Sequence, residues 1–381
     1  MNPGHPERPV RIGMIGGGPG AFIGAVHRIA LSMDGRCRLV AGAFSSSAAK
    51  SRETGAELGL DPTRAYGSWE EMLTRELELP EEDRIEAVSI VTPNHVHHGP
   101  AVAALEAGFH VICDKPLTIS SALAAEIASA VKASGREFAL THNYTGYPMI
   151  REARAWVEGG GVGKVLKVHA EYLQGWLVDP IEAEGQKQAS WRTDPARSGP
   201  GGALGDIGTH AFQLAEHVSG IAVQRLLGQR KSFVPSRAVD DDVMVLLEFE
   251  QGATGSVFAS QVCTGRENGL RLRIYGTEGG LEWDQEHPND LRILHKDGAT
   301  EIRRPGNAYV GEAAATMSRL PAGHPEGYLE GFANLYRAFA ARIRGASVDE
   351  SPFPTVEEGA RGVRFIETVI ASSEDERWLD F

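Results

Sequence analysis

The sequence contains little cysteine and neither a long apolar run nor a long basic run. Its three cysteines, Cys37, Cys113 and Cys263, are scattered without the spacing of a metal site, and we interpret them as reduced, buried thiols. No stretch approaches the roughly 20 uninterrupted apolar residues that a membrane helix needs, and the N-terminal MNPGHPERP has no signal-peptide core. We therefore expect a soluble, cytoplasmic protein without a membrane partner.

Charge and length limit the function further. The formal net charge is −13 at pH 7, which disfavours nucleic acid as a partner and favours a small polar ligand. With 381 residues and 42% hydrophobic content, the chain can bury two ordinary cores. We predict a flexible N-terminal tail over residues 1–9, a first domain over 10–141 and a second over 142–381.

The first domain alternates short apolar runs with helical patterns, which is typical of a doubly wound parallel sheet in an α/β fold. The apolar runs predict strands over residues 10–16, 38–44, 86–92, 110–113 and 137–140. The intervening segments predict helices over 21–33, 48–59, 68–77, 97–108 and 120–135. Because crossovers join the strands, we expect them to be parallel.

The pattern changes after about Thr141. Longer alternating segments are typical of a mainly antiparallel sheet, and they lie at 164–176, 241–262, 268–284 and 290–298. Two helices, over 328–344 and 356–373, are predicted to end the chain. The second domain is therefore expected to have an α+β fold.

The first predicted strand leads into GMIGGGPGAFIG, where Gly16, Gly18 and Ala21 match the dinucleotide-binding pattern G-x-G-x-x-G/A. Glycine there permits a tight turn and lets a pyrophosphate approach the amides at the start of a helix. A plain glycine turn is the alternative, but this match follows a predicted strand and opens a helix. The other expected cofactor contacts of this loop are Pro19, Gly20 and Phe22.

The end of the second predicted strand lacks the acid that holds the adenosine ribose in folds that prefer NAD. Phe44, Ser45 and Ser46 stand there instead. Lys50 and Arg52 either neutralise a 2′-phosphate or are solvated residues of the next helix. We favour NAD, with Ser45 and Lys50 as contacts, and NADP stays open.

Polar residues also follow the predicted strands at 86–92 and 110–113, at the edge where an open parallel sheet places its ligands. The first strand leads into Thr92, Pro93 and Asn94, and the second into Asp114 and Lys115. We expect these residues to contact the cofactor. An ordinary surface lysine is the alternative for Lys115.

The segment GALGDIGTHAFQLAEH places Asp206 four residues before His210. On a helix this spacing puts the carboxylate and the imidazole on one face. Such a pair can move protons, because a histidine with a pKa of about 6.5 is a general base near neutral pH. The alternative is a helix N-cap at Asp206 with an incidental buried histidine.

A metal site is a further alternative, because His95, His97 and His98 cluster and Asp206 with His210 has the spacing of a ligand pair. Zinc needs three or four ligands with a supporting shell. No H-E-x-x-H pattern joins these groups. We predict no metal.

The chain resembles the Gfo/Idh/MocA oxidoreductases, named for glucose-fructose oxidoreductase and inositol dehydrogenase. The resemblance rests on five motifs in the family's order: GMIGGGPGAFIG, TPNHVH, CDKP, WRTDP and GGALGDIGTH. The resemblance covers nearly the whole chain. It implies a Rossmann domain that binds NAD(P), followed by a large open antiparallel sheet that contacts substrate and other subunits. The usual E-K-P motif reads Asp114-Lys115-Pro116 here, so its acid is shortened and kept.

The resemblance also implies catalytic roles. Lys115 would contact the nicotinamide ribose and the reacting hydroxyl, Asp206 would position the substrate and the base, and His210 would take the hydroxyl proton. Asn94 and His97 match the family positions that line the nicotinamide. Lys115 would add positive charge where alkoxide character develops.

Several residues of the second domain are suited to a carbohydrate, because sugar rings stack on aromatic faces and hydroxyls need paired donors. The candidates are Tyr147, Trp176, Trp191, Arg192 and, in a loop, His324. Packing in the core or on a sheet face is the alternative for each aromatic residue.

We predict an NAD(P)-dependent dehydrogenase that acts on a secondary hydroxyl of a pyranose or cyclitol. The resemblance also predicts a homo-oligomer, a dimer or tetramer formed through the C-terminal sheet. An NAD-dependent glycosidase, which begins with the same oxidation, is one alternative. The other is a non-catalytic, cofactor-sensing regulatory protein, which would not require Lys115, Asp206 and His210.

Overall fold

The computed structural model describes residues 8–235, 237–346 and 353–381. By its internal contacts the chain divides into two compact units. The first combines Met1–Thr141 with Phe332–Ala360, and the second combines His142–Gly331 with Arg361–Phe381. Residues 1–7 of the expected N-terminal tail lie outside the described residues.

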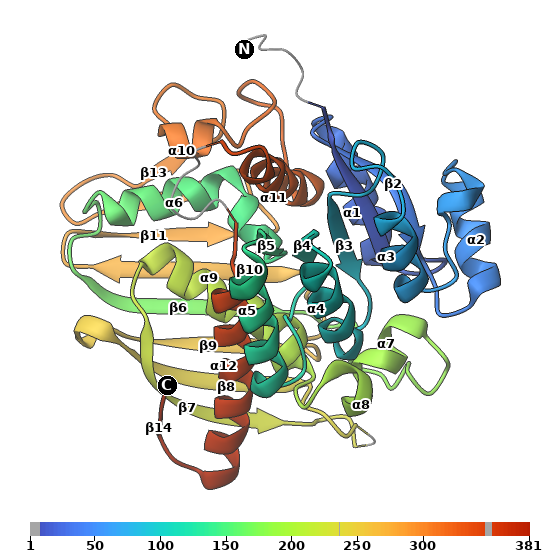
Figure 1. The fold of residues 1–381 in the computed structure, drawn as a ribbon. Helices are drawn as coiled ribbons and strands as arrows, with labels where there is room; N and C mark the ends of the chain where they lie inside the picture. The colour runs from blue at the N-terminus through green and yellow to red at the C-terminus, as the bar shows by residue number, and fades with distance from the viewer. Residues whose placement is uncertain (1–7, 236, 347–352) are drawn as a thin grey trace. The chain divides into compact units, whose positions relative to one another are not determined.

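The first unit is built on a five-stranded parallel sheet in the order β2-β1-β3-β4-β5 (Figure 1). Its strands are β1 (Val10–Gly16), β2 (Cys37–Ala43), β3 (Ala87–Val91), β4 (His110–Cys113) and β5 (Phe138–Leu140). Every residue of β3 is buried, as expected for a strand covered on both faces. The predicted doubly wound α/β fold is confirmed, and its strand order reverses between β1 and β3, where such sheets bind ligands.

Helices and short turns connect these strands. They are α1 (Phe22–Met33), α2 (Ala48–Glu57), η1 (Pro62–Arg64), α3 (Trp69–Leu77), η2 (Asn94–Val96), α4 (His98–Glu106) and α5 (Ser121–Ser134). Serine side chains begin two of them, because the hydroxyls of Ser68 and Ser120 accept backbone N–H bonds in the first turns of α3 and α5. Helix α5 ends at Gly135, whose φ of 62° suits glycine.

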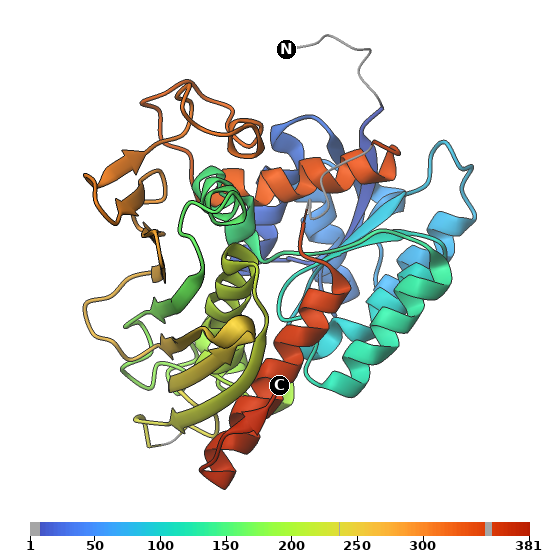
Figure 2. The same ribbon diagram turned by 90° about the vertical axis from the view of Figure 1, so that its left-hand side faces the viewer.

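From Phe332 on, helix α11 (Tyr328–Ile343) belongs to the first unit (Figure 2). Tyr336 of this helix is buried, and its hydroxyl lies 2.8 Å from Nδ1 of His27 and 2.8 Å from Oγ of Ser89. These bonds connect α11 with α1 and β3. Residues Phe332–Ala360, which we expected within the second domain, therefore belong by their contacts to the first unit.

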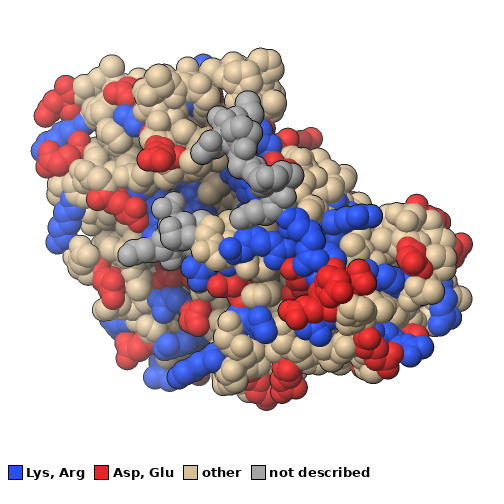
Figure 3. Space-filling model, turned by 45° about the horizontal axis from the view of Figure 1, so that its top comes forward, with Lys and Arg blue, Asp and Glu red and all other residues tan. Residues whose placement is uncertain are grey.

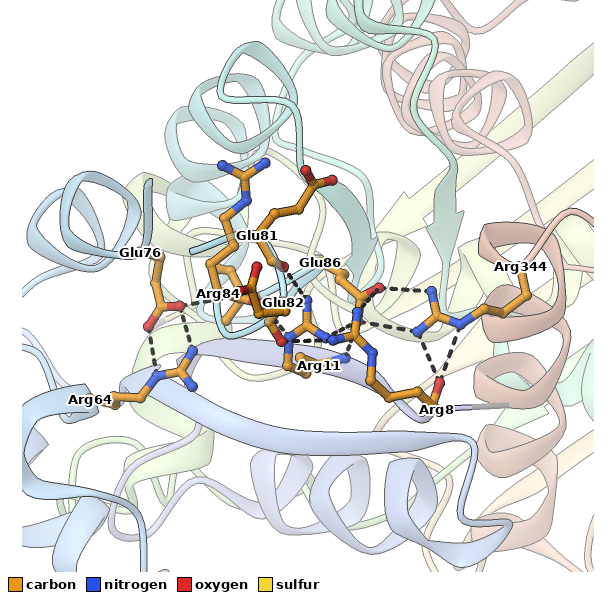
Figure 4. Close-up of polar contacts among 10 residues, drawn as sticks. Arg8, Arg11, Arg64, Glu76, Glu81, Glu82, Arg84, Glu86 and Arg344 are labelled. Atoms are coloured by element: carbon orange, nitrogen blue, oxygen red, sulfur yellow. Dashed lines mark hydrogen bonds and ion pairs between the residues drawn. The ribbon is translucent and has the colours of Figure 1, made fainter. Parts of the chain in front are cut away.

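Glu86, directly before β3, anchors the end of α11 (Figure 4). Its carboxylate lies 3.2 Å from Nη1 of Arg11 in β1 and 2.8 Å from Nη1 of Arg344 after α11. The exposed Arg8 makes a third contact at 3.4 Å. Because Arg11 and Glu86 are largely buried, removing the carboxylate would leave buried positive charge without a partner.

The second unit contains a nine-stranded sheet in the order β13-β12-β11-β10-β6-β9-β8-β7-β14 (Figure 1). The pair β6 and β9 is parallel, and the other described pairs are antiparallel. The predicted mainly antiparallel sheet is confirmed. Its strands are β6 (Val165–Leu173), β7 (Val223–Lys231), β8 (Asp242–Phe249), β9 (Thr254–Ser260), β10 (Gly269–Gly276), β11 (Gly279–Asp284), β12 (Leu291–His295), β13 (Glu301–Arg303) and β14 (Leu379–Asp380).

Helices cover one face of this sheet. Every residue of α9 (Thr209–Ser219) except Glu216 is buried, and Phe212 of this helix stacks on Phe365 of α12 (Val356–Asp375) with ring centroids 4.2 Å apart. On the other face, alternate residues of β8 such as Met244 and Leu246 are exposed. The remaining helical segments are η3 (Asn143–Gly146), α6 (Pro148–Glu158), α7 (Lys187–Arg192), α8 (Pro195–Ser198), η4 (Leu204–Gly208), η5 (Glu250–Gly252) and α10 (Glu312–Ala315).

Basic and acidic side chains lie next to one another over much of the face in Figure 3. In the part of the chain that the structure describes, no helix combines the length and apolar character needed to cross a membrane. All three cysteines are free thiols. Cys37 and Cys113 are buried as predicted, whereas Cys263 is only half-buried because it lies in the loop after β9.

Candidate active site

The loop after β1 has the backbone geometry that its glycines predict. Gly16 has a φ of 88°, and a Cβ there would lie 2.8 Å from Cγ2 of Thr92 and 2.9 Å from the carbonyl oxygen of Val91. The N–H of Gly18 donates to the carbonyl oxygen of Phe44 at 3.0 Å, and a Cβ at Gly18 would lie 2.5 Å from that oxygen. A side chain at either position would displace backbone, so the loop depends on glycine.

The start of α1 suits an anion. In the described structure, the N-cap residue Ala21 provides no side-chain hydrogen bond to the first turn of the helix. This first turn also carries no acidic residue. Helix N-termini of this kind bind phosphate through backbone N–H groups. Gly20 has a φ of 74°, and the ring of Phe22 is 63% exposed beside the loop.

The end of β2 contains no acidic side chain. Phe44 is buried with its ring under Gly42. The hydroxyl of Ser45 accepts the N–H of Ser47 at 3.2 Å. Lys50 and Arg52 are both exposed at the start of α2.

His97 connects the ends of β3 and β4. Its Nε2 lies 2.9 Å from the carbonyl oxygen of Thr92, and its Nδ1 lies 2.9 Å from that of Pro116. The side chain is buried, and burial lowers the pKa of its imidazole. Because backbone carbonyls face both ring nitrogens, His97 is placed to hold the two strand-end loops together.

Asp114 fixes the backbone at Lys115. Its Oδ1 accepts the N–H of Lys115 at 2.9 Å and the hydroxyl of Thr141 at 2.8 Å. The carboxylate that replaces the longer acid of the family motif therefore still orients the lysine loop. Asn94, the first residue of η2, is buried, while Thr92 and Pro93 between β3 and η2 are half-buried.

Asp206 lies in the second unit, in the π-helical turn η4 directly before α9. Its Oδ2 accepts hydrogen bonds from Nε of Arg192 at 3.0 Å and Nε2 of Gln261 at 2.9 Å. The N-caps of η4 and α9 are Ala203 and Gly208, so the alternative of an N-cap at Asp206 is wrong. Two donors hold the carboxylate in one orientation, and π-helical turns are frequent at functional sites.

Asp240 supports this turn from a distant segment. Its buried carboxylate accepts the N–H of Gly202 at 3.0 Å and the N–H of Leu204 at 2.8 Å. A Cβ at Gly202 would lie 2.0 Å from the carbonyl oxygen of Asp240. The glycine-rich approach to Asp206 therefore serves a close contact with the backbone before β8.

His210 occupies the first turn of α9 and is 7% exposed. Its Nδ1 lies 3.4 Å from Nδ1 of His142, and its ring centroid lies 4.9 Å from that of Tyr144 and 6.1 Å from that of Tyr172. The imidazole is thus confined by three other rings. These contacts fix the plane of the imidazole ring.

A chain of hydrogen bonds continues from these rings. Tyr172 donates its hydroxyl hydrogen to Oδ1 of Asn268 at 2.6 Å, so Tyr144 donates to Tyr172 at 2.5 Å. Nε2 of Gln174 also donates to Oδ1 of Asn268, at 2.9 Å, and Nε1 of Trp176 donates to Oε1 of Gln174 at 3.0 Å. Burial raises the pKa of Tyr144 to about 12 and that of Tyr172 as well, so both phenols stay protonated at neutral pH.

The other carbohydrate candidates are placed differently. The guanidinium of Arg192 lies 4.3 Å from the ring centroid of Trp191 and also bonds Asp206, so Trp191 lies near Asp206. Tyr147 is 1% exposed in the core, where its ring packs against Trp283. Tyr147 is therefore a core residue, and it is not part of the candidate site. His324 is exposed and lies 3.1 Å from the carbonyl oxygen of Pro321.

Five residues of the site were not predicted from the sequence: His142, Tyr144, Tyr172, Gln261 and Asn268. A signal existed for His142, because it follows the strand at 137–140 as Thr92 and Lys115 follow theirs. The others carry no motif, since they come from η3, β6 and the segment between β9 and β10.

The clustered histidines do not converge. His98 lies 2.7 Å from Oε2 of Glu126, and His97 faces backbone carbonyls. Among residues 8–235, 237–346 and 353–381, no group of three or more His, Cys, Asp and Glu side chains could hold a metal ion.

A dinucleotide-type loop on a parallel sheet, together with an acid and a buried histidine on a second unit, defines the class of NAD-binding oxidoreductases. Residues 10–142 match the model of the oxidoreductase family with an NAD-binding Rossmann fold, and residues 150–282 match that of the GFO/IDH/MocA C-terminal domain. The chain therefore belongs to the Gfo/Idh/MocA family of oxidoreductases.

Individual relatives agree with this assignment over nearly the full length. The uncharacterized oxidoreductase YfiI of Bacillus subtilis is 34% identical, with 98% of each chain covered. The solved structure of an inositol dehydrogenase homolog complexed with NAD+ from Azotobacter vinelandii is 37% identical with a TM-score of 0.93, again with 98% of each chain covered. Levoglucosan dehydrogenase of Pseudarthrobacter phenanthrenivorans is 28% identical, over 97% of this chain and 98% of the relative.

Proposed function

We propose that this protein is an NAD-dependent dehydrogenase that oxidises a secondary hydroxyl of a pyranose or cyclitol. The observation that carries the proposal is the surroundings of His210. The histidine lies beside a hydrogen-bonded chain of phenol, amide and indole groups, in the same unit as a fixed Asp206. Such convergent polar groups beside aromatic rings suit a polyhydroxylated ring.

The loop after β1 fits a dinucleotide. A Cβ at Gly18 would collide with the carbonyl oxygen of Phe44, so the backbone there is open only with glycine. When bound, the nicotinamide supplies a hydride acceptor. The residues proposed to hold the cofactor are the loop Gly16–Phe22, Ser45, Thr92, Pro93, Asn94, Asp114 and Lys115.

The remaining chemistry belongs to side chains. Hydride leaves carbon only as the attached hydroxyl loses its proton, and His210 takes that proton as the general base. Lys115 stabilises the developing alkoxide with its positive charge. Asp206, held by Arg192 and Gln261, orients the sugar and the base. Trp176 and Trp191 provide ring faces for the substrate.

The preference for NAD rests on the end of β2. In the described structure, the end of β2 has no acidic side chain that would exclude a 2′-phosphate. It also has no buried cation that would require a 2′-phosphate, because Lys50 and Arg52 are exposed. Relatives of known structure were solved with NAD+ or NADH. These facts favour NAD with modest discrimination against NADP.

The substrate class also draws on the relatives. One solved structure is the inositol dehydrogenase homolog complexed with NADH and myo-inositol, and another is levoglucosan dehydrogenase in complex with NADH and levoglucosan. Their ligands are a cyclitol and an anhydro-pyranose. A panel of inositols, levoglucosan and free pyranoses therefore covers the proposed class.

The test is a stoichiometry. The protein is incubated with NAD+ and each member of the panel, NADH absorbance is followed, and the carbohydrate product is quantified. A dehydrogenase yields NADH and a ketone in equal amounts and leaves aryl glycosides intact. Release of the aglycone over many turnovers with only trace NAD+ and no net NADH would instead establish a glycosidase.

The same assay distinguishes a dehydrogenase from a non-catalytic, cofactor-sensing regulatory protein. Such a protein would bind NAD+ in a titration but produce no NADH, even in a single turnover at high protein concentration. The dehydrogenase proposal requires at least one panel member to give stoichiometric NADH. The absence of NADH with every member would favour the cofactor-sensing alternative.

We further propose that the chain forms a dimer or tetramer through the uncovered face of the nine-stranded sheet. Met244 and Leu246 of β8 are each 53% exposed on that face, and Leu166 is 45% exposed. Exposed apolar groups of this kind mark interfaces between subunits. Light scattering should give the mass of two or four chains, and Met244→Lys with Leu246→Lys should lower it.

A further inference from the structure

His142 lies between β5 and η3 and faces the proposed base. Its Nδ1 is 3.4 Å from Nδ1 of His210, with ring centroids 5.2 Å apart and ring planes at 85°. His142 is 1% exposed and His210 is 7% exposed. Both imidazoles are therefore removed from bulk water, and their Nδ1 atoms point at each other.

This contact restricts the hydrogens on the two rings. Two imidazole nitrogens attract each other only when one carries a hydrogen and the other does not. Neutral His210 can therefore be the donor, with its hydrogen on Nδ1, or the acceptor, with its hydrogen on Nε2. As the acceptor, His210 has no bare nitrogen left for the substrate, so only the donor form is a competent base.

We propose that His142 is a positioning residue that accepts the Nδ1–H of His210 and thereby keeps Nε2 of His210 bare for the substrate proton. This inference rests on the proposed function, in which His210 is the general base. His142 itself is neutral and carries its hydrogen on Nε2. It plays the part that a carboxylate or carbonyl plays behind many catalytic histidines.

The proton and electron balance is simple. As the C–H bond of the substrate breaks and its electron pair leaves with the hydride for NAD+, the hydroxyl proton moves to Nε2 of His210. The products are a ketone, NADH and an imidazolium at His210. The hydrogen on Nδ1 stays in place, and its bond to His142 becomes charge-assisted and therefore stronger.

Neighbouring charges favour His142 as the neutral partner. His217 of α9 interacts electrostatically with His142, and His217 also interacts with Arg151 and Arg154 of α6. Nη1 of Arg154 is 3.1 Å from Nδ1 of His217. Positive charge near His217 opposes a further positive charge on His142. Among the described residues, Tyr144 and Tyr172 contact the ring of His210, and Asp206, which is bonded to Arg192, interacts with Tyr144. Arg151 and Arg154 interact with His217.

Two substitutions of His142 separate positioning from proton relay. In His142→Asn the amide oxygen offers an acceptor near the place of Nδ1 but cannot be protonated, whereas His142→Leu offers none. We expect kcat of His142→Leu to fall at least about tenfold, as part of the roughly 10²–10⁴-fold contribution of a general base is lost. We expect His142→Asn to stay within about threefold of the wild type. Equal losses in both variants would overturn the inference.

The pH profile gives a second readout. An acceptor at Nδ1 stabilises imidazolium more than neutral imidazole, so removing it lowers the pKa of His210. The acid limb of kcat/KM should therefore move to lower pH in His142→Leu and return toward the wild-type position in His142→Asn. An unmoved acid limb in His142→Leu would contradict the role of His142.

A matched control is available on the same helix. His217 is also 7% exposed, and its observed bond is to Arg154. His217→Leu removes an equally buried imidazole and should leave the position of the acid limb unchanged. A shift equal to that of His142→Leu would show that any buried histidine has this effect, and would overturn the inference.

The tautomer itself can be read without turnover. Long-range ¹H–¹⁵N spectra of histidine-labelled protein, assigned with His210→Gln, should show His210 with hydrogen on Nδ1 in the wild type and in His142→Asn. His142→Leu should populate the other tautomer. If the spectra agree but no substrate is oxidised, the proposed function has failed while the His142 contact stands. If the wild type already holds hydrogen on Nε2, the inference itself fails.

Discussion

The dinucleotide loop after β1 and the polar site around His210 are encoded over very different distances along the chain. The loop takes its shape from Gly16, Gly18 and Gly20, which are nearly consecutive, with one close approach to Phe44. The site around His210 draws on η3, β6, η4, α9 and the segment between β9 and β10. The first is a short motif, and the second exists only in the folded unit.

This difference matters for what can be changed. A glycine loop fails when a single Cβ is added, because the collision is with backbone that cannot move aside. A site of distant side chains fails when one member loses its partner, because a buried polar group is then left unsatisfied. The first region should therefore respond to size, and the second to hydrogen-bonding capacity and charge.

The largest expected effect is in the second region. His210→Ala should lower kcat by about 10²-fold or more, because general-base catalysis contributes on that scale. The affinity for NAD+ should be nearly unchanged, since the glycine loop lies in the other unit. Steady-state kinetics and a cofactor titration check both statements. A kcat close to that of the wild type would remove His210 from the mechanism.

The next effect tests a buried contact that spans the chain. Burial lowers the pKa of His27 to about 4 from 6.5, so between these values the unfolded chain binds the proton and the folded one does not. Stability should therefore fall as the pH drops from 6.5 toward 4, by up to about 3 kcal/mol from this group.

Urea unfolding of the wild type and His27→Leu at several pH values isolates that contribution. The variant should lose less stability over this range, although it is less stable at neutral pH without the bond to Tyr336. His110, whose pKa burial also lowers to about 4, is present in both proteins and cancels. Parallel pH curves would contradict the assignment to His27.

A smaller effect tests the loop by size alone. Gly18→Ala places a methyl group where 2.5 Å separates it from the oxygen of Phe44, and should weaken NAD+ binding by about tenfold. The control is Gly362→Ala in α12, because a Cβ there has no atom within 4 Å. This control should leave NAD+ affinity unchanged. Equal affinities for both variants would mean that the loop tolerates the added atom.

The smallest effect concerns cofactor choice. Lys50→Ala and Arg52→Ala remove exposed charges, so NAD+ affinity should change by less than about twofold and NADP+ affinity by only a few fold. Titrations with both cofactors measure this. Much tighter NADP+ binding in the wild type, lost in the two variants, would reverse the preference for NAD.

The two regions also differ in how well the sequence predicts them. The five parallel strands and the loop follow from apolar runs, crossovers and glycine spacing, all of which are local. His97 was assigned to the nicotinamide by resemblance, yet its two nitrogens face the carbonyls of Thr92 and Pro116. Tyr147 was assigned to a substrate, yet it packs in the core against Trp283. The sequence alone does not show whether an aromatic side chain packs in the core or faces a substrate.

The sequence by itself determined the doubly wound sheet, the glycine loop and the placement of Asp206 and His210 on adjoining helical turns, because periodicity and steric collisions act between near neighbours. Only the tertiary structure decided that Arg192 and Gln261 hold Asp206, that His142 faces His210, and that Tyr336 bonds His27 across 309 residues. Those partners depend on how strands and helices pack. A buried polar group takes its hydrogen bond from whatever element the fold brings within reach.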